Sequence, residues 1–343
     1  MKTIGILTGG GDCPGLNPVI RAIVRKGLTQ DYKILGIRNG WKGLLEKDTI
    51  NLDINSVSGI LHKGGTILRT SRTNPYNSDG DAQKVFDNFK FLKLDALIPI
   101  GGEDTLGVAA KLYRDFKLPV VGVPKTIDND IPGTDFTFGF DTAVNVAMEC
   151  IDRLHTTAES HNRVMIVEVM GRHAGWIALY AGLAGGADAI LIPEKPVDMD
   201  EVCSLIKKRH SRGKNFSVVV VAEGAKFKES DDVIQDDGID SFGHVKLGGI
   251  GQQVADKLEE VTGYETRVTV LGHIQRGGSP SAYDRVLGTR YGIKAFELVD
   301  QDNFGRVVAL RGNEIIDIPI EEVLGKLKTV DDKIYNIAAT FFG

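Results

Sequence analysis

Two aspartates, a lysine and a threonine lie close together in the segment 124–130, Pro-Lys-Thr-Ile-Asp-Asn-Asp. The segment follows the apolar run 118–123, which predicts a buried parallel strand. It therefore lies at the carboxyl end of a strand, where open α/β sheets bind ligands. Asp128 can act as a base, Asp130 as a second carboxylate and Lys125 as a cation, which indicates chemistry on an anionic substrate. An Asx-rich turn with solvated charges explains the same residues equally well.

The elements that must position this segment follow an α/β pattern, because short β-rich runs alternate with helical segments, as in proteins with largely parallel sheets. The predicted strands cover residues 4–8, 94–100, 118–123, 164–169, 189–192, 216–222 and 267–271. The predicted helices cover residues 17–28, 105–116, 141–155, 176–183, 199–212, 251–261 and 282–299.

The overall composition is that of an ordinary globular protein, with 42% hydrophobic and 25% charged residues, and 343 residues are enough for two domains. The net charge of −5 argues against a nucleic-acid-binding protein. The three cysteines form no CxxC pair, which indicates no disulfide framework and no zinc site. We see no signal peptide and no apolar stretch of about 20 residues that would span a bilayer. We therefore expect a cytoplasmic protein with no membrane partner.

Three strand ends carry glycine clusters that open into helices, at residues 9–15, 101–102 and 171–175. Glycine allows close approach of a ligand to the backbone, and the N-terminus of a helix offers unpaired N–H groups, so phosphate is the natural ligand. A tight turn without a ligand explains any one of these loops. None of them matches GxxxxGK[ST] or GxGxxG, which excludes the two commonest nucleotide-binding motifs.

Arginines and histidines recur at the predicted carboxyl ends of the later strands and in their loops. Arginine binds phosphate through two parallel hydrogen bonds, so this set predicts a doubly charged sugar-phosphate ester as ligand. A surface salt bridge explains any single arginine. The set consists of His161, Arg163, Arg172, Arg267, His273 and Arg276, with Glu223 directly after a strand.

The chain resembles the 6-phosphofructokinase family in four long motifs that occur in the family's order. These motifs are residues 5–17, 124–130, 167–172 and 271–280, and the resemblance extends through most of the chain. It implies transfer of a phosphoryl group to the 1-hydroxyl of fructose 6-phosphate, with Mg²⁺ as the cofactor.

The resemblance also implies two Rossmann-like three-layer α/β/α domains with largely parallel sheets and the active site in the cleft between them. The domain that binds the phosphoryl donor and magnesium would consist of residues 1–138 and 276–304. The domain that binds fructose 6-phosphate would consist of residues 139–275 and 305–343.

Catalytic roles follow from the same resemblance. Asp128 would be the general base that takes the hydroxyl proton, with Thr126 and Asp130 beside it. Arg172 would hold the developing negative charge together with magnesium. Glu103 would be the carboxylate of the magnesium site, where ATP-using members of the family usually carry aspartate.

The resemblance implies binding residues for both substrates. Gly10 and Gly11 would form the loop that holds the donor phosphates. Arg163 and Arg267 would reach the sugar phosphate across a subunit interface, which implies a homodimer or homotetramer with shared active sites. The remaining sugar-phosphate contacts would be Met170, Gly171, Arg172, Glu223, His273 and Arg276.

Two positions bear on the phosphoryl donor, because ATP-using relatives generally carry glycine where this chain has Asp104 and Lys125. Asp104 would place a negative charge where the α-phosphate of ATP lies, and like charges about 4 Å apart repel by about 4 kcal/mol at an effective dielectric constant of about 20. Lys125 would bring a cation to a small donor. Asp104 and Lys125 therefore favour pyrophosphate as the donor, and with this donor the reaction is expected to be reversible. A salt bridge between Asp104 and Lys125 would be a neutral alternative.

Two other functions remain open from the sequence. The first is an ATP-dependent 6-phosphofructokinase, and the second is a non-catalytic subunit that binds a sugar phosphate. The presence of Asp128, Arg163 and Arg172 argues against the second.

Overall fold

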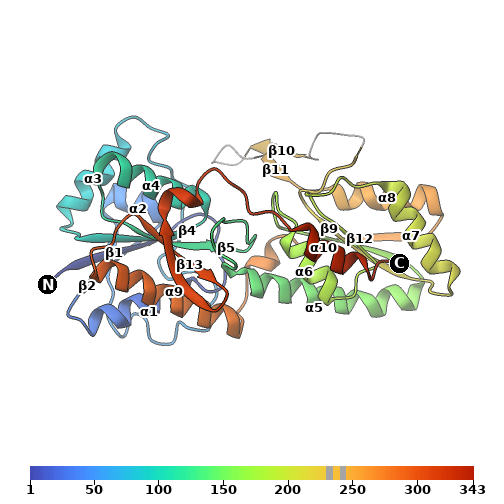
Figure 1. Ribbon diagram of the computed structural model, residues 1–343, viewed down its shortest axis with the longest axis horizontal. Helices are drawn as coiled ribbons and strands as arrows, with labels where there is room; N and C mark the ends of the chain where they lie inside the picture. The colour runs from blue at the N-terminus through green and yellow to red at the C-terminus, as the bar shows by residue number, and fades with distance from the viewer. Residues whose placement is uncertain (229–234, 240–244) are drawn as a thin grey trace. The chain divides into compact units, whose positions relative to one another are not determined.

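The chain folds into two compact units in the computed structural model, which describes residues 1–228, 235–239 and 245–343 (Figure 1). Unit 1 is assembled from residues 1–127, 131–142 and 276–327. Unit 2 is assembled from residues 128–130, 143–275 and 328–343. Each unit is an α/β structure on a mostly parallel sheet, as the sequence predicts.

Unit 1 contains a sheet of strand order β14-β13-β5-β4-β1-β2-β3, with the short strand β6 beside β5. Only the β2–β3 and β13–β14 pairs of this sheet are antiparallel. A parallel sheet is covered on both faces, which explains the nearly continuous burial of β1 and β4. The strands are β1 (Thr3–Thr8), β2 (Lys33–Ile37), β3 (Thr49–Asn51), β4 (Ala96–Gly101), β5 (Val121–Thr126), β6 (Phe138–Gly139), β13 (Arg306–Arg311) and β14 (Glu314–Pro319).

The helices of unit 1 form two groups (Figure 1). Helices α1 and α9 pack against each other, and α2, α3 and α4 pack in series. Apolar residues of α4, of the central strands and of the β13–β14 hairpin form one buried core. The helices are α1 (Leu16–Leu28), α2 (Gly40–Glu46), α3 (Asp81–Phe91), α4 (Glu103–Phe116), α9 (Ala282–Asp300) and the 3₁₀ helix η2 (Ile320–Val323).

Unit 2 contains a four-stranded sheet of order β12-β7-β9-β8, in which all neighbours are parallel. The two central strands are buried on both faces, and their valine-rich sequences are typical of such positions. A separate antiparallel hairpin joins β10 and β11. The strands are β7 (Val164–Val169), β8 (Ala189–Leu191), β9 (Ser217–Ala222), β10 (Gln235–Ile239), β11 (Val245–Leu247) and β12 (Thr266–Val270).

Helices on both faces of this sheet complete unit 2. Helix α8 packs on β7 and β12, and α6 packs on β8 and β9. Helix α7 begins at Asp198, whose side chain accepts hydrogen bonds from two first-turn N–H groups. The helices are α5 (Phe140–His161), α6 (Trp176–Ala184), α7 (Met199–Ser211), α8 (Ile250–Thr262), α10 (Asp332–Ala339) and the 3₁₀ helix η1 (Gly272–Arg276).

The strand predicted at residues 118–123 differs from β5, which runs from Val121 to Thr126. Lys125 and Thr126 are strand residues because they pair with the two residues of β6. This pairing lies outside the apolar run on which the prediction depends. Lys125 and Thr126 are therefore held by the sheet, and the turn begins after them.

The domain boundary expected at residue 305 is wrong. Strand β13 pairs in parallel with β5 through Arg306 with Val121 and Val307 with Gly122. Residues 305–327 therefore belong to unit 1. The pairing joins residues that are far apart in sequence, so the local pattern could not reveal it.

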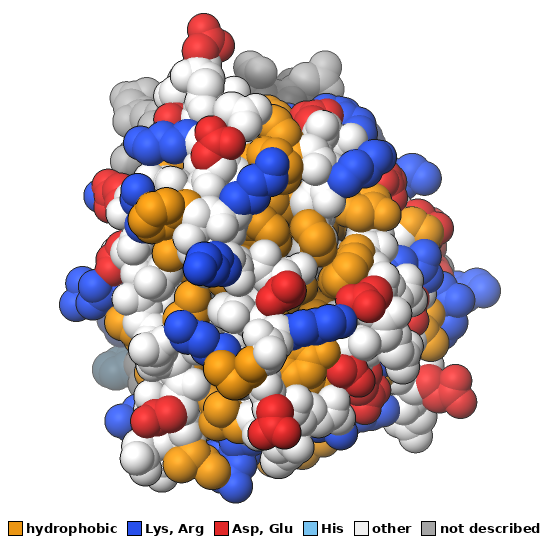
Figure 2. All heavy atoms as spheres, turned by 90° about the vertical axis from the view of Figure 1, so that its left-hand side faces the viewer, with side chains coloured by type: hydrophobic (Ala, Val, Ile, Leu, Met, Phe, Trp, Pro, Cys, Tyr) orange, Lys and Arg blue, Asp and Glu red, His pale blue; other side chains and the backbone are white. Residues whose placement is uncertain are grey.

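Charge is evenly mixed on the face of the molecule shown in Figure 2, where basic and acidic side chains alternate. This face carries no basic patch of the kind that binds nucleic acid. Within the residues that the structure describes, every helix is too short or too polar to cross a bilayer.

Candidate active site

The carboxyl ends of β1, β4 and β5 lie side by side in unit 1. Thr8 is in register with Ile100, and Gly101 is in register with Pro124. The chain continues from β1 to β2 on one side and returns to β4 on the other, which makes this edge a topological switch point. Ligands bind at such points in open α/β sheets. The structure therefore brings both glycine loops of unit 1 to the edge where Lys125 lies.

Thr105 explains why two of these loop positions are glycine. This buried side chain lies in the first turn of α4. A Cβ atom on Gly9 or on Gly101 would overlap Thr105, so neither position tolerates a side chain. Gly10 adopts a φ of 75°, in the left-handed region that favours glycine. No local sequence signal marks Thr105, because its role depends on contact with two separate loops.

Two cations flank the loop of Gly10 and Gly11. The ammonium group of Lys125, a residue only 3% exposed, donates a hydrogen bond to Gly11 O. The guanidinium of Arg276 donates through Nη1 to Asp12 O at 3.4 Å, and a Cβ atom on Gly11 would lie 2.8 Å from that nitrogen. Two positive charges beside glycine backbone form a cradle for an anion. Arg276, expected among the sugar contacts, lies in unit 1 beside this loop.

Glu103 and Asp104 form the first turn of α4 at the same edge. Glu103 is exposed and Asp104 is half-buried. The preceding residue, Gly102, lies close to Lys125, because a Cβ atom on it would be 3.5 Å from Lys125 O. Both acidic residues directly follow Gly101 and Gly102, at the start of α4.

The second group of predicted residues lies in unit 2, at the carboxyl ends of β7 and β9. Val169 is in register with Ala222, so Met170 and Glu223 follow adjacent strands. The backbone N–H of Arg172 donates to Glu223 Oε1 at 3.0 Å. Gly171 adopts a φ of 147°, and a Cβ atom there would lie 2.6 Å from Ala174 O, so the turn requires glycine.

Glu223 has an unusual protonation equilibrium. Burial, and after it the negative charge of nearby Asp128, raise the pKa of its carboxyl to about 7. Asp128 itself is only 6% exposed. The structure therefore brings together two carboxyl groups that the sequence places almost a hundred residues apart. One of them holds its proton close to neutral pH.

A cavity of about 520 Å³ opens beside Glu223 within unit 2. It is large enough for a sugar phosphate, and most of its polar groups come from the ends of strands. Three of the predicted substrate residues line it, namely Met170, Glu223 and His273. The other lining residues are Glu168, Leu247, Gly248, Gly249, Gln253, Val270 and Gly272.

Arg163 and Arg267 lie elsewhere, and the expectation that they follow the carboxyl ends of strands is wrong. Arg163 precedes β7, and Arg267 is the second residue of β12. Both pair with Glu265 at the amino ends of these strands. A six-residue strand is about 20 Å long, so these arginines are distant from the Glu223 cavity of their own chain.

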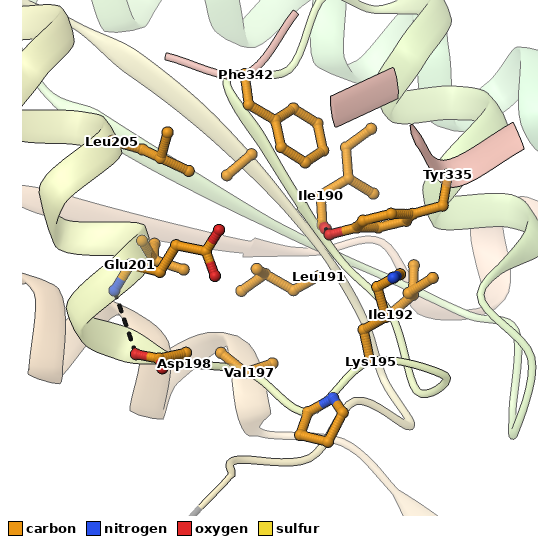
Figure 3. Close-up of a pocket in the computed structure, with 13 residues that line it drawn as sticks. Ile190, Leu191, Ile192, Lys195, Val197, Asp198, Glu201, Leu205, Tyr335 and Phe342 are labelled. Atoms are coloured by element: carbon orange, nitrogen blue, oxygen red, sulfur yellow. Dashed lines mark hydrogen bonds between the residues drawn. The ribbon is translucent and has the colours of Figure 1, made fainter. Parts of the chain in front are cut away.

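A second cavity of unit 2, of about 240 Å³, lies away from all predicted site residues (Figure 3). Strand β8, the start of α7, Tyr335 and Phe342 enclose it. Two of the charged residues that line it form ion pairs, Lys195 with Asp332 at 3.0 Å and Asp198 with Lys228 at 3.1 Å. Most of the residues that line it are apolar, and its charged residues are Lys195, Asp198 and Glu201.

Comparison with known proteins decides the family. The family model described as Phosphofructokinase matches residues 3–299. The chain belongs to the phosphofructokinase family. The four motifs and the two-unit α/β fold are those of a phosphofructokinase.

Individual relatives of this phosphofructokinase differ in the donor that they are named for. A Streptomyces coelicolor protein named pyrophosphate–fructose 6-phosphate 1-phosphotransferase is 57% identical, with 99% of each chain covered. Another S. coelicolor protein, named ATP-dependent 6-phosphofructokinase 3, is 53% identical, with 97% of each chain covered. Overall identity therefore discriminates weakly between the donors.

A solved structure supports the fold of this phosphofructokinase. The phosphofructokinase of Pichia pastoris, in a crystal structure of its T-state, superimposes with a TM-score of 0.85 at 31% identity. The match covers 99% of this chain and 36% of that chain.

The residues at the carboxyl ends of β1, β4 and β5 of this phosphofructokinase fit a magnesium ion. Mg²⁺ prefers hard oxygen ligands and is usually bound by one or two carboxylates together with substrate phosphates. Among the residues that the structure describes, no three His, Cys, Asp or Glu side chains gather as a complete metal cage. The exposed carboxylate of Glu103, beside the phosphate cradle, suits a metal that is completed by the donor itself.

A Glu223→Gln variant tests whether the pKa of the Glu223 carboxyl is raised in this phosphofructokinase. The folded protein binds the proton of the Glu223 carboxyl more tightly than the unfolded chain does. The stability that this protonation contributes is therefore fully present below about pH 4.5 and is lost as the pH rises to about 7. The free energy of unfolding of the unaltered protein, relative to that of the variant, is therefore expected to fall across this window. Urea denaturation at a series of pH values measures it.

The exposed Glu314, on β14, provides a control for this comparison. A Glu314→Gln variant should follow the pH dependence of the unaltered protein. If the Glu223→Gln curve also runs parallel to that of the unaltered protein, the carboxyl of Glu223 has an ordinary pKa.

Proposed function

We propose that the protein catalyses reversible transfer of a phosphoryl group from pyrophosphate to the 1-hydroxyl of fructose 6-phosphate, which gives fructose 1,6-bisphosphate and phosphate. The observation that carries this proposal is the buried ammonium of Lys125 on the loop of Gly10 and Gly11. Relatives named for this reaction over their full length support it. ATP is the alternative donor, since relatives named for ATP are also similar.

In this proposal, unit 1 binds the donor. The glycine loop, Lys125 and Arg276 hold the phosphate oxygens and neutralise their charge. Magnesium, held by Glu103 and the donor phosphates, supplies further stabilisation of negative charge when it is bound. The negative charge of Asp104 repels the α-phosphate of ATP, so the site accepts only a small donor. Phosphoryl transfer depends mainly on positioning and on charge stabilisation, which these groups supply.

The acceptor is bound by unit 2. Asp128 takes the proton of the 1-hydroxyl, with Thr126 and Asp130 beside it, and the side chain of Arg172 stabilises the transferred group. The Glu223 cavity, with Met170, Gly171 and His273, holds the sugar. A carboxyl with a pKa of about 7 can donate a hydrogen bond to a sugar hydroxyl near neutral pH, as Glu223 would.

The active form in this proposal is a homodimer or a homotetramer. Arg163 and Arg267 share Glu265 at the amino ends of their strands, away from the Glu223 cavity of their own chain. Both arginines are partly exposed, so they can serve the sugar phosphate of a neighbouring subunit. We place the reaction in the cytoplasm, because Cys13, Cys150 and Cys203 are free thiols, as is usual in reducing compartments.

The test is formation of fructose 1,6-bisphosphate by the pure protein with magnesium, with either pyrophosphate or ATP as the donor. We expect product with pyrophosphate and none with ATP. Product with ATP alone would overturn the donor, and Asp104 would then have to move aside. Product with neither donor would support a non-catalytic subunit that binds a sugar phosphate.

A further inference from the structure

Asn17 lies at the centre of a hydrogen-bond network that no catalytic role explains. The residue is in the first turn of α1 and is only 1% exposed. Its amide nitrogen donates to Lys63 O at 3.0 Å and to Gly64 O at 3.3 Å. Its amide oxygen accepts from Ile67 N at 2.9 Å. One side chain therefore satisfies three backbone groups of a segment about fifty residues away.

That segment, residues 63–71, continues to the donor loop, and we name it the clamp segment. Its Thr70 donates through Oγ1 to Gly10 O at 2.6 Å. The carbonyl of Ser71 accepts from Gly10 N at 3.3 Å. Both backbone polar groups of Gly10 are thus held by the clamp segment, which fixes the orientation of the peptide that leads to Gly11.

Further contacts hold the clamp segment on the strand that precedes the loop. Thr8, the last residue of β1, donates through Oγ1 to Arg69 O at 2.6 Å. The same hydroxyl shares a hydrogen bond of 3.1 Å with Thr66 Oγ1. These bonds are short and partly buried, so they restrict the clamp segment to one position.

The other side of the clamp segment lies against the chain that follows Arg276. A Cβ atom on Gly64 would overlap Gly278 O, so the two backbones are in close contact. Ser279 donates through Oγ to His62 O at 2.8 Å. The clamp segment therefore lies between the two stretches of chain that supply the donor cradle.

We propose that Asn17 is a positioning residue for the phosphoryl donor, which sets the geometry of the cradle of Gly10, Gly11 and Lys125 by fixing the clamp segment. The inference rests on the proposed function, since it assigns the donor to this loop. Asn17 reaches the donor through the clamp segment and Gly10, and it touches neither substrate. Backbone groups bind phosphate only when they are aimed at its oxygens, so a rotated Gly10 peptide would weaken donor binding selectively.

An Asn17→Leu variant keeps the approximate shape of the side chain and removes all three hydrogen bonds. We expect its KM for pyrophosphate to rise about tenfold or more, because a displacement of about 1 Å in a binding group can cost about 100-fold. The KM for fructose 6-phosphate should stay unchanged. Steady-state rates with each substrate varied in turn provide both values.

Asn88 offers a matched control. It is also buried, and its amide donates to Leu44 O and Leu45 O, both at 2.9 Å, in the packing of α3 against α2. An Asn88→Leu variant should lose stability in a thermal melt, as Asn17→Leu does, but keep the KM for pyrophosphate. Equal KM values for pyrophosphate in the two variants would show that Asn17 has only a structural role.

A Thr70→Val variant keeps the proposal testable if Asn17→Leu does not fold. It removes only the hydrogen bond to Gly10 O and should raise the KM for pyrophosphate in the same direction, and an unchanged value would overturn the proposal. If the unaltered protein turns over ATP and not pyrophosphate, the proposed donor fails, and the same comparison of KM values is made with ATP. If neither donor is used, calorimetric affinities for pyrophosphate replace KM, and equal affinities in all variants overturn the inference.

Discussion

Replacement of Asp128 by asparagine is expected to lower kcat about 10²–10⁴-fold, the usual contribution of a general base. Asparagine has the shape of aspartate but cannot accept the proton of the 1-hydroxyl. The side chain is nearly buried, so water cannot readily replace it as the base. Binding of fructose 6-phosphate, measured by calorimetry without a donor, should remain close to that of the unaltered protein.

The same variant has a second expected effect, on the neighbouring carboxyl. The charge of Asp128 contributes to the raised pKa of Glu223, so its removal should lower that pKa from about 7. The pH at which sugar-phosphate binding changes should therefore move to lower values. An Asp95→Asn variant, which alters an exposed carboxylate before β4, controls for the loss of a negative charge. Turnover near that of the control would remove Asp128 as the base.

The second large effect is expected when Asp104 and Lys125 are both replaced by glycine. Charge-assisted hydrogen bonds contribute about 1.5–3 kcal/mol, so loss of the Lys125 ammonium should lower kcat/KM for pyrophosphate about 10–100-fold. Loss of the Asp104 carboxylate removes the repulsion against an α-phosphate. We therefore expect turnover with ATP to become measurable in the double variant.

Single variants separate the two contributions. Lys125→Gly alone should weaken pyrophosphate use without admitting ATP, and Asp104→Gly alone should admit ATP with a smaller loss for pyrophosphate. Lys117 provides the control, because it is exposed at the end of α4 with a φ of 54°, where glycine fits well. Unchanged pyrophosphate kinetics in the double variant would refute the assignment of the donor to these residues.

The sequence predicts well those parts of the fold that a local residue pattern indicates. The predicted bounds of helix α1 and strand β7 agree with the structure to within one residue. An amphipathic period and a run of apolar β-branched residues are both local signals. The sequence does not predict the hairpin of β13 and β14, because its place beside β5 depends on pairing between distant residues, Arg306 with Val121 and Val307 with Gly122. The strand β6 has only two residues, which is too short for a local pattern to indicate.

In the candidate site, too, local signals are predicted well and contacts between distant residues are not. The sequence predicts that the glycine loops 9–15 and 101–102 and Lys125 each follow a strand, and the structure brings these strand ends to one edge of the sheet. The predicted strands place Arg163 and Arg267 at amino ends, as the structure does, so their grouping with residues at carboxyl ends does not follow from the strand pattern. Asn17 and Thr70 were not identified as supports of the donor loop, since their partners lie fifty to sixty residues away.

The order in which the chain builds its two units has a consequence for synthesis on the ribosome. The four strands of the unit 2 sheet come from one continuous stretch, so this sheet can form as soon as β12 has emerged. In unit 1, β6 pairs with the end of β5 at Lys125 and Thr126, but the edge of β5 at Val121 and Gly122 stays open until β13 has been made. A nascent chain thus carries an open strand edge through the synthesis of all of β7 to β12, and exposed edges of this kind invite pairing with other chains. The late hairpin of β13 and β14 closes that edge.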